Sequence, residues 1–577
     1  MIAVVAKTLP RNGDVAGQLE LLADLLEIEG QAAFRVLAYR RAAARVRETG
    51  TPVAQLALDG TAKELPGIGA TIQDKIVQIV DTGEIEALAK RRKTIPPEVV
   101  DFLQIPGLGP KTVRKIWQEL GVTTLAELKD AARAKRLRTL PGLGAKTEEN
   151  VLASAGRKRK VTGPQRTLLG QALPALLAVV DVLREHPAAE RVCEAGSARR
   201  RRETVRDLDI IATANDPKAL TEYFTKLTWV SEVVAKGPTK ATVVSHEGFR
   251  FDLRVVPPES YGNLLQHFTG SKEHNLALRE DAVRRGFSVS EYGVTEVETG
   301  DVSTAESEEE VYERLGYAYI PPELRENAGE LKAARDGTLP TLVEQGQLRG
   351  DLHTHSHWSA DGKNTLEEMV AAALERGYAY YAVTDHSHYL RESRMEAQAR
   401  EIDKLAERVA PLKLLKGVEA NIKADGTLDV PDEVLAERDW VVASIHTAFD
   451  RSPTERVLET MENPHVDVIG HLTGRKITRR EPMDIDLERV VEKALETGTF
   501  LEINSQPDRL DLRDVDARLA GEAGVTIVIS SDAHQVRALD YVDFGVAQAR
   551  RAWLGPEQIA NTRTWVQLRK LRKKGRR

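Results

Sequence analysis

Three aspartates in this sequence have the spacing needed for metal-dependent chemistry on nucleotides. Asp207 and Asp209 lie two residues apart in the apolar run DLDIIAT, and Asp252 lies in a second such run, FRFDLRVV. Residues two apart in a strand share one face of the sheet. Mg²⁺ prefers carboxylate oxygens, and two such ions activate a 3′ oxygen and stabilise a pyrophosphate leaving group. Although paired aspartates on strands are common in other proteins, the three together indicate nucleotidyl transfer.

A second set of side chains indicates hydrolysis at phosphorus. Nine of the 13 histidines lie between His353 and His534, and several follow apolar, β-branched runs. Mixed imidazole and carboxylate ligands suit Mn²⁺, Zn²⁺ or Fe²⁺ better than Mg²⁺, and such ions activate water and hold phosphate oxygens. A single histidine is more often a buried imidazole than a ligand, but this ordered series predicts a site for up to three ions. Its nine candidate ligands are His353, His355, Asp361, His386, Glu419, His446, His471, Asp532 and His534.

A glycine motif occurs three times near the N-terminus, as LPGIGATIQDKI from Leu65, IPGLGPKTVRKI from Ile105 and LPGLGAKTEENV from Leu140. Its two glycines allow a tight turn whose backbone N–H groups point outward at the start of a helix. Such a turn binds phosphate without reading a base. One copy alone could equally be a turn between packed helices, but three copies indicate DNA binding through Gly67, Gly69, Gly107, Gly109, Lys111, Gly142 and Gly144.

The third copy differs from the other two in charge. It carries Glu148 and Glu149, which would repel a phosphate. We therefore expect this copy to have a structural role.

The elements that must position these residues follow from the hydrophobic pattern. Apolar residues recur at helical spacing near the N-terminus, strand-like runs follow a helix breaker at Gly163-Pro164, and seven β runs alternate with helical patterns after Asp351. We expect a multidomain chain with helical modules, an α+β part and an α/β barrel of seven βα units, whose strand ends meet at one mouth. The expected boundaries are 1–90, 91–162, 163–260, 261–322, a linker at 323–349, and 350–577.

Composition limits the alternatives. The 577 residues hold 82 Lys and Arg against 88 Asp and Glu, a net charge of −6, which excludes a basic nucleic-acid coat protein. The single Cys193 excludes an intramolecular disulfide framework and any CxxC metal site. Since no apolar run approaches a membrane span or a signal segment, we expect a cytoplasmic protein that does not bind membranes. The last ten residues, LRKLRKKGRR, are expected to form a solvated basic tail that touches DNA.

The chain up to about residue 320 resembles the family X DNA polymerases, the group that includes DNA polymerase beta. The resemblance rests on GSARR from Gly196, on DLD, FDLR and HFTGSKEHN, on Gly286-Phe287 and Glu291-Tyr292, and on the glycine-motif copies, which are helix-hairpin-helix motifs. It implies a polymerase-beta-like palm at 163–260 and thumb at 261–322, with two Mg²⁺ or Mn²⁺ ions on Asp207 and Asp209 and with Asp252 as base or ligand for the primer 3′-OH. The implied substrate-binding residues are Ser197 and Arg200 for the triphosphate, His267 and Phe268 for the sugar, Asn275 for the base, Arg279 for the template, and Gly270.

Two positions depart from that family's pattern. Arg206 stands where beta-type enzymes have a glycine beside the first metal aspartate, so affinity for the nucleotide or preference for the metal could differ. Lys75 falls on the lysine of the family's lyase activity, but Thr71 replaces the neighbouring lysine. Lys75 could form a Schiff base only with a depressed pKa; the alternative is a lysine that contacts phosphate.

The segment from Asp351 to about Trp553 resembles the PHP (polymerase and histidinol phosphatase) domain. The resemblance implies one ion on His353, His355, Glu419 and Asp532, a second that shares Glu419 with His446 and His471, and a third on Asp361, His386 and His534. A family X polymerase joined to an intact PHP domain resembles the bacterial enzymes of this type. This implies gap filling in DNA repair, including base excision repair, with a Mn²⁺- or Zn²⁺-containing 3′–5′ exonuclease and cleavage at abasic sites.

The partners expected on this basis are gapped DNA or DNA 3′ ends and dNTPs, with a monomeric chain associated with the bacterial nucleoid. Two other functions fit parts of the sequence. The barrel could be a phosphatase for a small metabolite on a DNA-binding scaffold, or the chain could be a DNA-bound scaffold with an inactive polymerase site. The helix-hairpin-helix motifs argue against the first alternative, and the three aspartates argue against the second.

Overall fold

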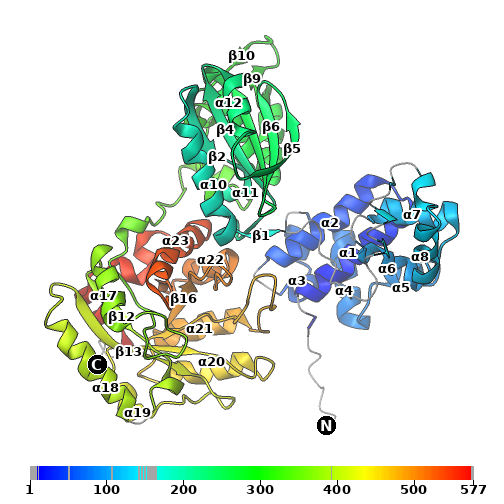
Figure 1. Ribbon diagram of the computed structural model, residues 1–577. Coiled ribbons are helices and arrows are strands. Elements are labelled where there is room, and N and C mark those ends of the chain that lie inside the picture. The colour runs from blue at the N-terminus through cyan, green and yellow to red at the C-terminus, as the bar shows by residue number, and fades with distance from the viewer. Residues whose placement is uncertain are drawn as a thin grey trace, which may run out of the picture. The chain divides into compact units, whose positions relative to one another are not determined.

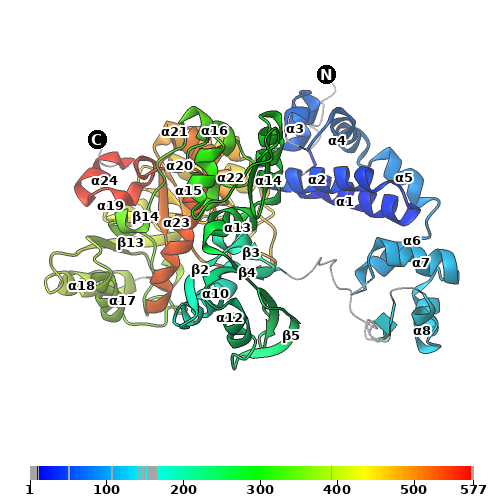
Figure 2. The same cartoon turned by 90° about the horizontal axis from the view of Figure 1, so that it is seen from above.

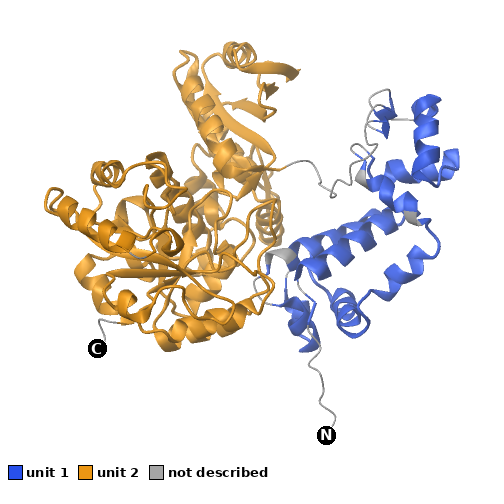
Figure 3. Ribbon diagram, turned by 60° about the horizontal axis from the view of Figure 1, so that its bottom comes forward, with its two compact units in different colours: residues 1–165 blue, residues 166–577 orange. Residues whose placement is uncertain are grey.

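The computed structural model (Figure 1, and from above in Figure 2) describes residues 9–10, 12–49, 52–65, 67–105, 108–140, 143–144, 147–148, 151–152, 166–391 and 393–573. The chain divides into two compact units, residues 1–165 and 166–577 (Figure 3). Among the described residues, no helix is both long enough and apolar enough to span a bilayer.

The first unit is helical, as predicted. Its helices share one apolar core that includes Leu19, Ile76 and Ile116. Glycines end two of them in the left-handed conformation, Gly83 with φ of 83° and Gly121 with φ of 67°, where side-chain-bearing residues are strained. The α-helices among its described residues are α1 Asn12–Glu29, α2 Ala33–Glu48, α3 Val53–Leu58, α4 Ala70–Thr82, α5 Glu86–Arg92, α6 Pro97–Asp101, α7 Pro110–Leu120 and α8 Leu125–Arg133.

The second unit begins with a five-stranded sheet of order β2-β4-β7-β6-β5, in which only β4 and β7 run parallel. Leu208, Ile210 and Ala212 of β4 are buried in one core with residues of α10 and α12. Because side chains alternate along a strand, Asp207 and Asp209 lie on the opposite face, where α13 packs. The elements are α10 Leu169–Arg184, β2 Ala189–Glu194, α11 Gly196–Arg199, β4 Asp207–Ala214, α12 Pro217–Phe224, β5 Val230–Lys236, β6 Lys240–Ser245 and β7 Arg250–Val256, beside the short pair β1 Thr167–Leu168 and β3 Thr204–Val205.

A smaller mixed region follows this sheet. It packs around Leu278, Tyr312 and Ile320, and a fully buried Arg325 pairs with Glu308 at 2.5 Å. Its elements are α13 Tyr261–Thr269, α14 Lys272–Arg284, β8 Phe287–Ser290, β9 Gly293–Glu296, β10 Val302–Ser303, α15 Glu308–Arg314 and α16 Glu330–Asp336.

The rest of the second unit is the predicted barrel. Its seven strands are parallel and pair in chain order, and helices lie outside them (Figure 1). The first and last strand ends are joined where Asp532 N–H donates to His353 O at 2.9 Å and His355 N–H donates to Ala533 O at 2.8 Å. The strands are β11 Gly350–Asp351, β12 Tyr380–Val383, β13 Lys413–Asn421, β14 Trp440–Ser444, β15 Val468–Ile469, β16 Phe500–Asn504 and β17 Ile527–Ser530. The helices are α17 Leu366–Glu375, α18 Ser393–Ala406, α19 Asp432–Ala436, α20 Pro453–Glu462, α21 Leu487–Thr497, α22 Asp514–Glu522, α23 Val542–Arg551 and α24 Trp565–Leu571.

The expectation of a solvated tail is wrong for its described part. Helix α24 buries Leu568, and Arg572, which is only 4% exposed, donates to both oxygens of the buried Asp467 at 2.7 and 2.9 Å. Lys573 donates to the carbonyl oxygens of Met461 and Asn463. The helical spacing of the tail's apolar residues, rather than its charge, therefore decides that it packs on the barrel. Residues 574–577 lie outside the described residues.

The Arg572–Asp467 pair gives a prediction about stability. We expect Arg572→Ala to lower the free energy of unfolding of the barrel by about 3–5 kcal/mol, because it leaves a buried carboxylate without its partner. Arg569→Ala, at an exposed position of the same helix, should change it by less than about 0.5 kcal/mol. Hydrogen exchange of the barrel strands measures both; equal protection in the two variants would contradict the prediction.

Candidate functional site

The structure places the three aspartates together on one face of the five-stranded sheet. Asp209 and Asp252 are direct neighbours on the parallel strands β4 and β7, and Asp207 is on the same face as Asp209. Gly196, with φ of 63°, lies so close that a Cβ there would be 2.3 Å from Asp209 Oδ2. The glycine of the GSARR motif is therefore needed to make room for a carboxylate.

The charges around the aspartates favour bound cations. Burial and then the carboxylates of Asp252 and Asp207 raise the pKa of Asp209 to about 6. Arg206 Nε pairs with Asp207 at 2.9 Å, and Arg250 Nε pairs with Asp252 at 3.1 Å. Arg206, which departs from the polymerase pattern, thus binds the very carboxylate predicted to hold metal.

The predicted triphosphate residues lie beside this face. Ser197 is on α11, and Arg200 caps the C-terminal end of that helix. Arg200 Nε donates to Glu326 at 3.0 Å, and its Nη1 donates to the carbonyl oxygen of Thr269, next to Gly270. Gly270 ends α13 with φ of 70°. Arg200 and Gly270 are thus brought together, but the Arg200 guanidinium is already paired.

The other predicted substrate residues form one connected group at the end of α13. Asn275 donates to His267 O at 2.7 Å, and Arg279 Nη2 lies 3.0 Å from His267 Nδ1. The Phe268 ring lies 5.1 Å from the His267 ring, and Arg254 stacks on Phe268 at 4.2 Å. Side chains of α13 and α14 that are up to 12 residues apart in sequence, from His267 to Arg279, therefore lie in contact with one another.

In the first unit, the glycine turns begin helices as predicted. Gly67 has φ of 88°, Gly69 is the N-cap of α4 and Gly109 is the N-cap of α7. Lys111 lines a pocket together with Arg114 and Lys115. Gly144 is the second glycine of the third turn, and its carbonyl oxygen accepts from Thr147 N–H at 3.0 Å. Gly107 and Gly142 lie outside the described residues.

In the third copy, the acidic residue Glu148 forms an ion pair with Arg138, which lies just before the motif. Glu148 is 3% exposed and accepts from Arg138 Nε at 2.9 Å, so this carboxylate does not face a ligand. Lys75, on α4, is half-buried and lines a pocket that also contains Lys90, Arg91 and Glu29. These cations could contact a phosphate, and nothing in this geometry singles out a Schiff base.

At the barrel mouth, four of the nine candidate ligands enclose one point. His353 Nε2 lies 3.5 Å from Glu419 Oε2 and 3.7 Å from Asp532 Oδ1, and His355 Nε2 lies 3.7 and 3.2 Å from the same two oxygens. The nitrogens and Glu419 Oε2 are buried and have no hydrogen-bond partner among the described residues. A bound cation would satisfy the lone pairs of such unpartnered imidazole nitrogens and carboxylate oxygens.

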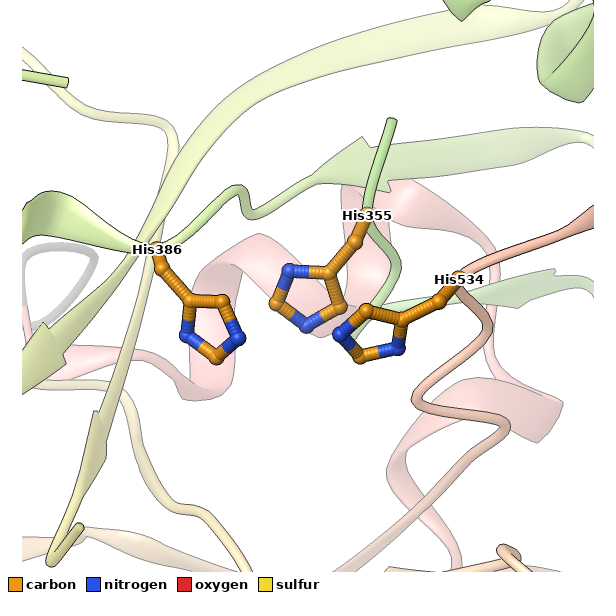
Figure 4. Close-up of side chains that lie close together, drawn as sticks. All are labelled: His355, His386 and His534. Atoms are coloured by element: carbon orange, nitrogen blue, oxygen red, sulfur yellow. The ribbon is translucent and has the colours of Figure 1, made fainter. Parts of the chain in front are cut away.

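The remaining five candidates form two adjoining groups. His446 Nε2 and His471 Nε2 lie 3.2 and 3.1 Å from Glu419 Oε1. His386 Nε2 and His534 Nε2 lie 3.6 and 3.4 Å from Asp361 Oδ2. Figure 4 shows His355, His386 and His534 side by side, and their ligand nitrogens lie within 4.8 Å of one another. All nine predicted side chains thus converge at the mouth, but the groups overlap: His386 Nδ1 also lies 2.6 Å from Glu419 Oε2, and His386 clusters both with His355 and His534 and with Glu419 and His446.

The electrostatics of the mouth also fit cations. Burial opposes the charged form of His353, but the carboxylates of Glu502, Glu419 and Asp532 outweigh it and raise the pKa of His353 well above its usual value. Burial likewise opposes the charge on Glu419, yet His386, His446 and His353 hold the pKa of Glu419 well below its usual range. The carboxylates therefore stay charged and need positive partners, which protons or metal ions would supply.

Sequence reasoning missed Glu502 and Asn421, two of the residues that hold these ligands in place. Glu502 is fully buried, lies 2.7 Å from His353 Nδ1 and accepts from His471 N–H at 2.7 Å. Asn421 Oδ1 lies 2.5 Å from His446 Nδ1, and Asn504 donates to Asp532 at 2.9 Å. Glu502 lies two residues before the strand-end residue Asn504 in the run TFLEINS, a spacing that could have revealed it.

Comparison with known proteins agrees with this architecture. Family models for a helix-hairpin-helix domain, a SAM-like helix-hairpin-helix tandem, a DNA polymerase beta thumb and a PHP domain match residues 10–85, 99–157, 264–326 and 351–506. The barrel is similar to proteins named probable phosphatases. That of Caldanaerobacter subterraneus is 34% identical over 33% of this chain and 78% of its own length, and that of Acetivibrio thermocellus is 32% identical over 32% and 78%.

One relative matches nearly the whole chain. The DNA polymerase/3′-5′ exonuclease PolX of Bacillus subtilis is 39% identical over 563 residues, which cover 96% of this chain and 97% of that protein. Similarity of this extent spans both the aspartate-bearing sheet and the histidine-rich barrel. The chain therefore belongs to the PolX family of family X DNA polymerases with a C-terminal PHP domain.

Proposed function

We propose that this protein is a DNA repair enzyme that fills short gaps at the sheet site and trims 3′ ends at the barrel mouth. The observation that carries the proposal is the presence, within one compact unit, of two separate clusters built for cations: the aspartates of β4 and β7, and the nine barrel side chains. The helix-hairpin-helix turns of the first unit would hold the DNA backbone without reading sequence.

At the sheet site, Asp207, Asp209 and Asp252 would hold two Mg²⁺ or Mn²⁺ ions, which supply charge stabilisation at the transferring phosphate. Arg200 and Ser197 would bind the triphosphate, and the group around His267 and Asn275 would fix the sugar and base. Arg206 and Arg250 would have to release their carboxylates when ions bind. Their position beside the aspartates would let the two guanidinium groups neutralise the carboxylates whenever no metal ions are bound.

At the barrel mouth, the nine ligands would hold up to three ions, with Mn²⁺ or Zn²⁺ favoured by the imidazole content. Such ions activate water and bind phosphodiester oxygens. The chain's own part is to fix the ligands: Glu502 and Asn421 bond the second ring nitrogens of His353 and His446, so that Nε2 of each faces the mouth. Cleavage at abasic sites and a dependence on Mn²⁺ remain part of this proposal.

A second candidate function has an observation in its favour. The barrel alone is similar to proteins named probable phosphatases, so it could act on a small phosphomonoester. Excess gapped DNA should suppress hydrolysis of 4-nitrophenyl phosphate if the two compete for one mouth, with DNA as the preferred substrate. Phosphomonoester turnover that outpaces DNA trimming would favour the alternative.

The two-site proposal predicts separable losses. With a 5′-labelled primer on a gapped duplex and Mn²⁺, Asp207→Ala should lose extension at least about a hundredfold and keep shortening, because it removes a metal ligand from one site only. His353→Ala should show the reverse pattern. The measurement is a gel assay with and without dNTPs. Survival of both activities in either variant would contradict the residue assignments.

The buried carboxylate of Asp209, whose pKa is raised, predicts that removing its charge stabilises the protein in a pH-dependent way. Its pKa of about 6 lies above the ordinary aspartate value of 3.8, so ionisation destabilises the folded state as the pH rises from about 4 through 6. In EDTA at pH 7.5, Asp209→Asn should stabilise the protein by up to about 3 kcal/mol, and the gain should shrink as the pH falls. Thermal unfolding at several pH values measures this. Glu190→Gln, at an exposed position on β2, controls for net charge, and a gain independent of pH would refute the cause.

The buried Glu502 predicts an effect on metal affinity. Glu502→Gln keeps the size of the side chain but weakens its bond to His353 Nδ1, and it should reduce Mn²⁺ affinity about 10–100-fold. Isothermal titration of the metal-free protein with Mn²⁺ measures this directly. Glu522→Gln, at an exposed position on α22, is the control; unchanged Mn²⁺ binding in Glu502→Gln would exclude the positioning role.

A further inference from the structure

The barrel contacts the loop that carries the predicted triphosphate arginine. Arg551 of α23 is 3% exposed at its side chain, and its Nη1 donates to the carbonyl oxygen of Arg200 at 2.8 Å and to Glu326 Oε1 at 3.0 Å. Its Nη2 donates to Asp514 Oδ2 of the barrel at 2.5 Å. A single barrel side chain thus reaches both the backbone of Arg200 and the acid that holds the Arg200 guanidinium.

A second contact braces the other end of the same loop. Arg475 donates to Glu203 Oε2 at 2.7 Å and to Leu510 O at 2.7 Å. Pro507 of the barrel packs so closely on α10 that a Cβ at Gly170 would be 2.2 Å from it. The segment from Arg200 to Glu203 is therefore held by the barrel at its first and last residues.

Glu326 accepts hydrogen bonds from both Arg200 and Arg551, and Arg202 lies 4.0 Å away. Burial opposes its charge, but Arg202, Arg200 and Arg551 outweigh it and hold the pKa of Glu326 at about 2. A triphosphate that binds Arg200 must compete with this ionised carboxylate. When Arg200 turns to the phosphates, Glu326 stays paired only through its remaining cations, of which Arg551 makes the hydrogen bond at 3.0 Å and Arg202 lies 4.0 Å away.

We propose that Arg551 is a positioning residue for nucleotide binding, through which the nuclease barrel forms part of the polymerase site. Its guanidinium holds the Arg200 backbone through a hydrogen bond to the carbonyl oxygen. When the Arg200 side chain binds the triphosphate, Arg551 remains as the hydrogen-bonded partner of Glu326. Arg551 itself touches no substrate. This inference rests on the proposed polymerase function and on the predicted role of Arg200.

The proposal predicts that replacing Arg551, which does not contact the nucleotide, weakens nucleotide binding. Arg551→Gln should raise the KM for dNTP in gap filling about tenfold, an ordinary size for coupling between linked sites, with little change in kcat. Binding of the complementary dNTP to a gapped duplex with a dideoxy-terminated primer should weaken by the same factor. The matched control is Arg550→Gln, the preceding residue of α23, which breaks a pair with Glu323 instead.

A second variant separates positioning from a general loss of structure. Glu326→Gln removes the competing charge, so adding Arg551→Gln to it should raise KM by much less than tenfold; a merely structural role would give additive or larger losses. Arg551→Lys should rescue only in part, because an ammonium lacks the planar fork that bridges three acceptors. Exonuclease activity and thermal unfolding verify folding of each variant.

The outcomes distinguish this inference from the function on which it rests. If the wild-type protein does not extend a gapped primer, the proposed polymerase function fails. If it does extend, but Arg551→Gln has the same KM and dNTP affinity as Arg550→Gln, the positioning role is refuted. If the full tenfold loss persists in the Glu326→Gln background, the route through Glu326 is refuted and only the hydrogen bond to the Arg200 backbone remains as the cause.

Discussion

The Glu419 carboxylate is the point at which the barrel mouth is held together. It is 1% exposed, and its two oxygens lie 2.6–3.7 Å from nitrogens of five imidazoles, those of His353, His355, His386, His446 and His471. A buried charge is costly unless it is paired. Four strand ends must therefore deliver imidazoles to one spot, and the parallel barrel, closed between His353 and Ala533, is what brings ends of distant strands so close.

The two cation sites solve the same electrostatic problem differently. Around Glu419 the partners are imidazoles, which would become metal ligands in their deprotonated form, so the proposed site lies wholly within the barrel. On the sheet, Arg206 and Arg250 pair with the aspartates, and ions would have to displace them. The first arrangement suits tightly held ions, and the second suits ions that arrive with a nucleotide.

Two largely buried arginines of the barrel form ion pairs with the polymerase part of the second unit. Arg475 with Glu203 and Arg551 with Glu326 join segments that are more than 200 residues apart in sequence. Paired charges of this kind fix geometry more than they add stability. This gives a physical reason for the barrel to be a permanent part of the polymerase module.

The sequence by itself determined the helical first unit, the seven-stranded parallel barrel and the convergence of the nine barrel ligands, because the period of apolar residues and the strand-end positions are local features. The aspartate face also followed from two-residue spacing. Tertiary structure alone decided the rest. The burial of Arg572 depends on Asp467, the orientation of His353 on Glu502, and the pairing of Arg200 on Glu326 and Arg551. Each of these pairs is more than 100 residues apart. Local patterns carry no record of such partners, which meet only when whole elements pack.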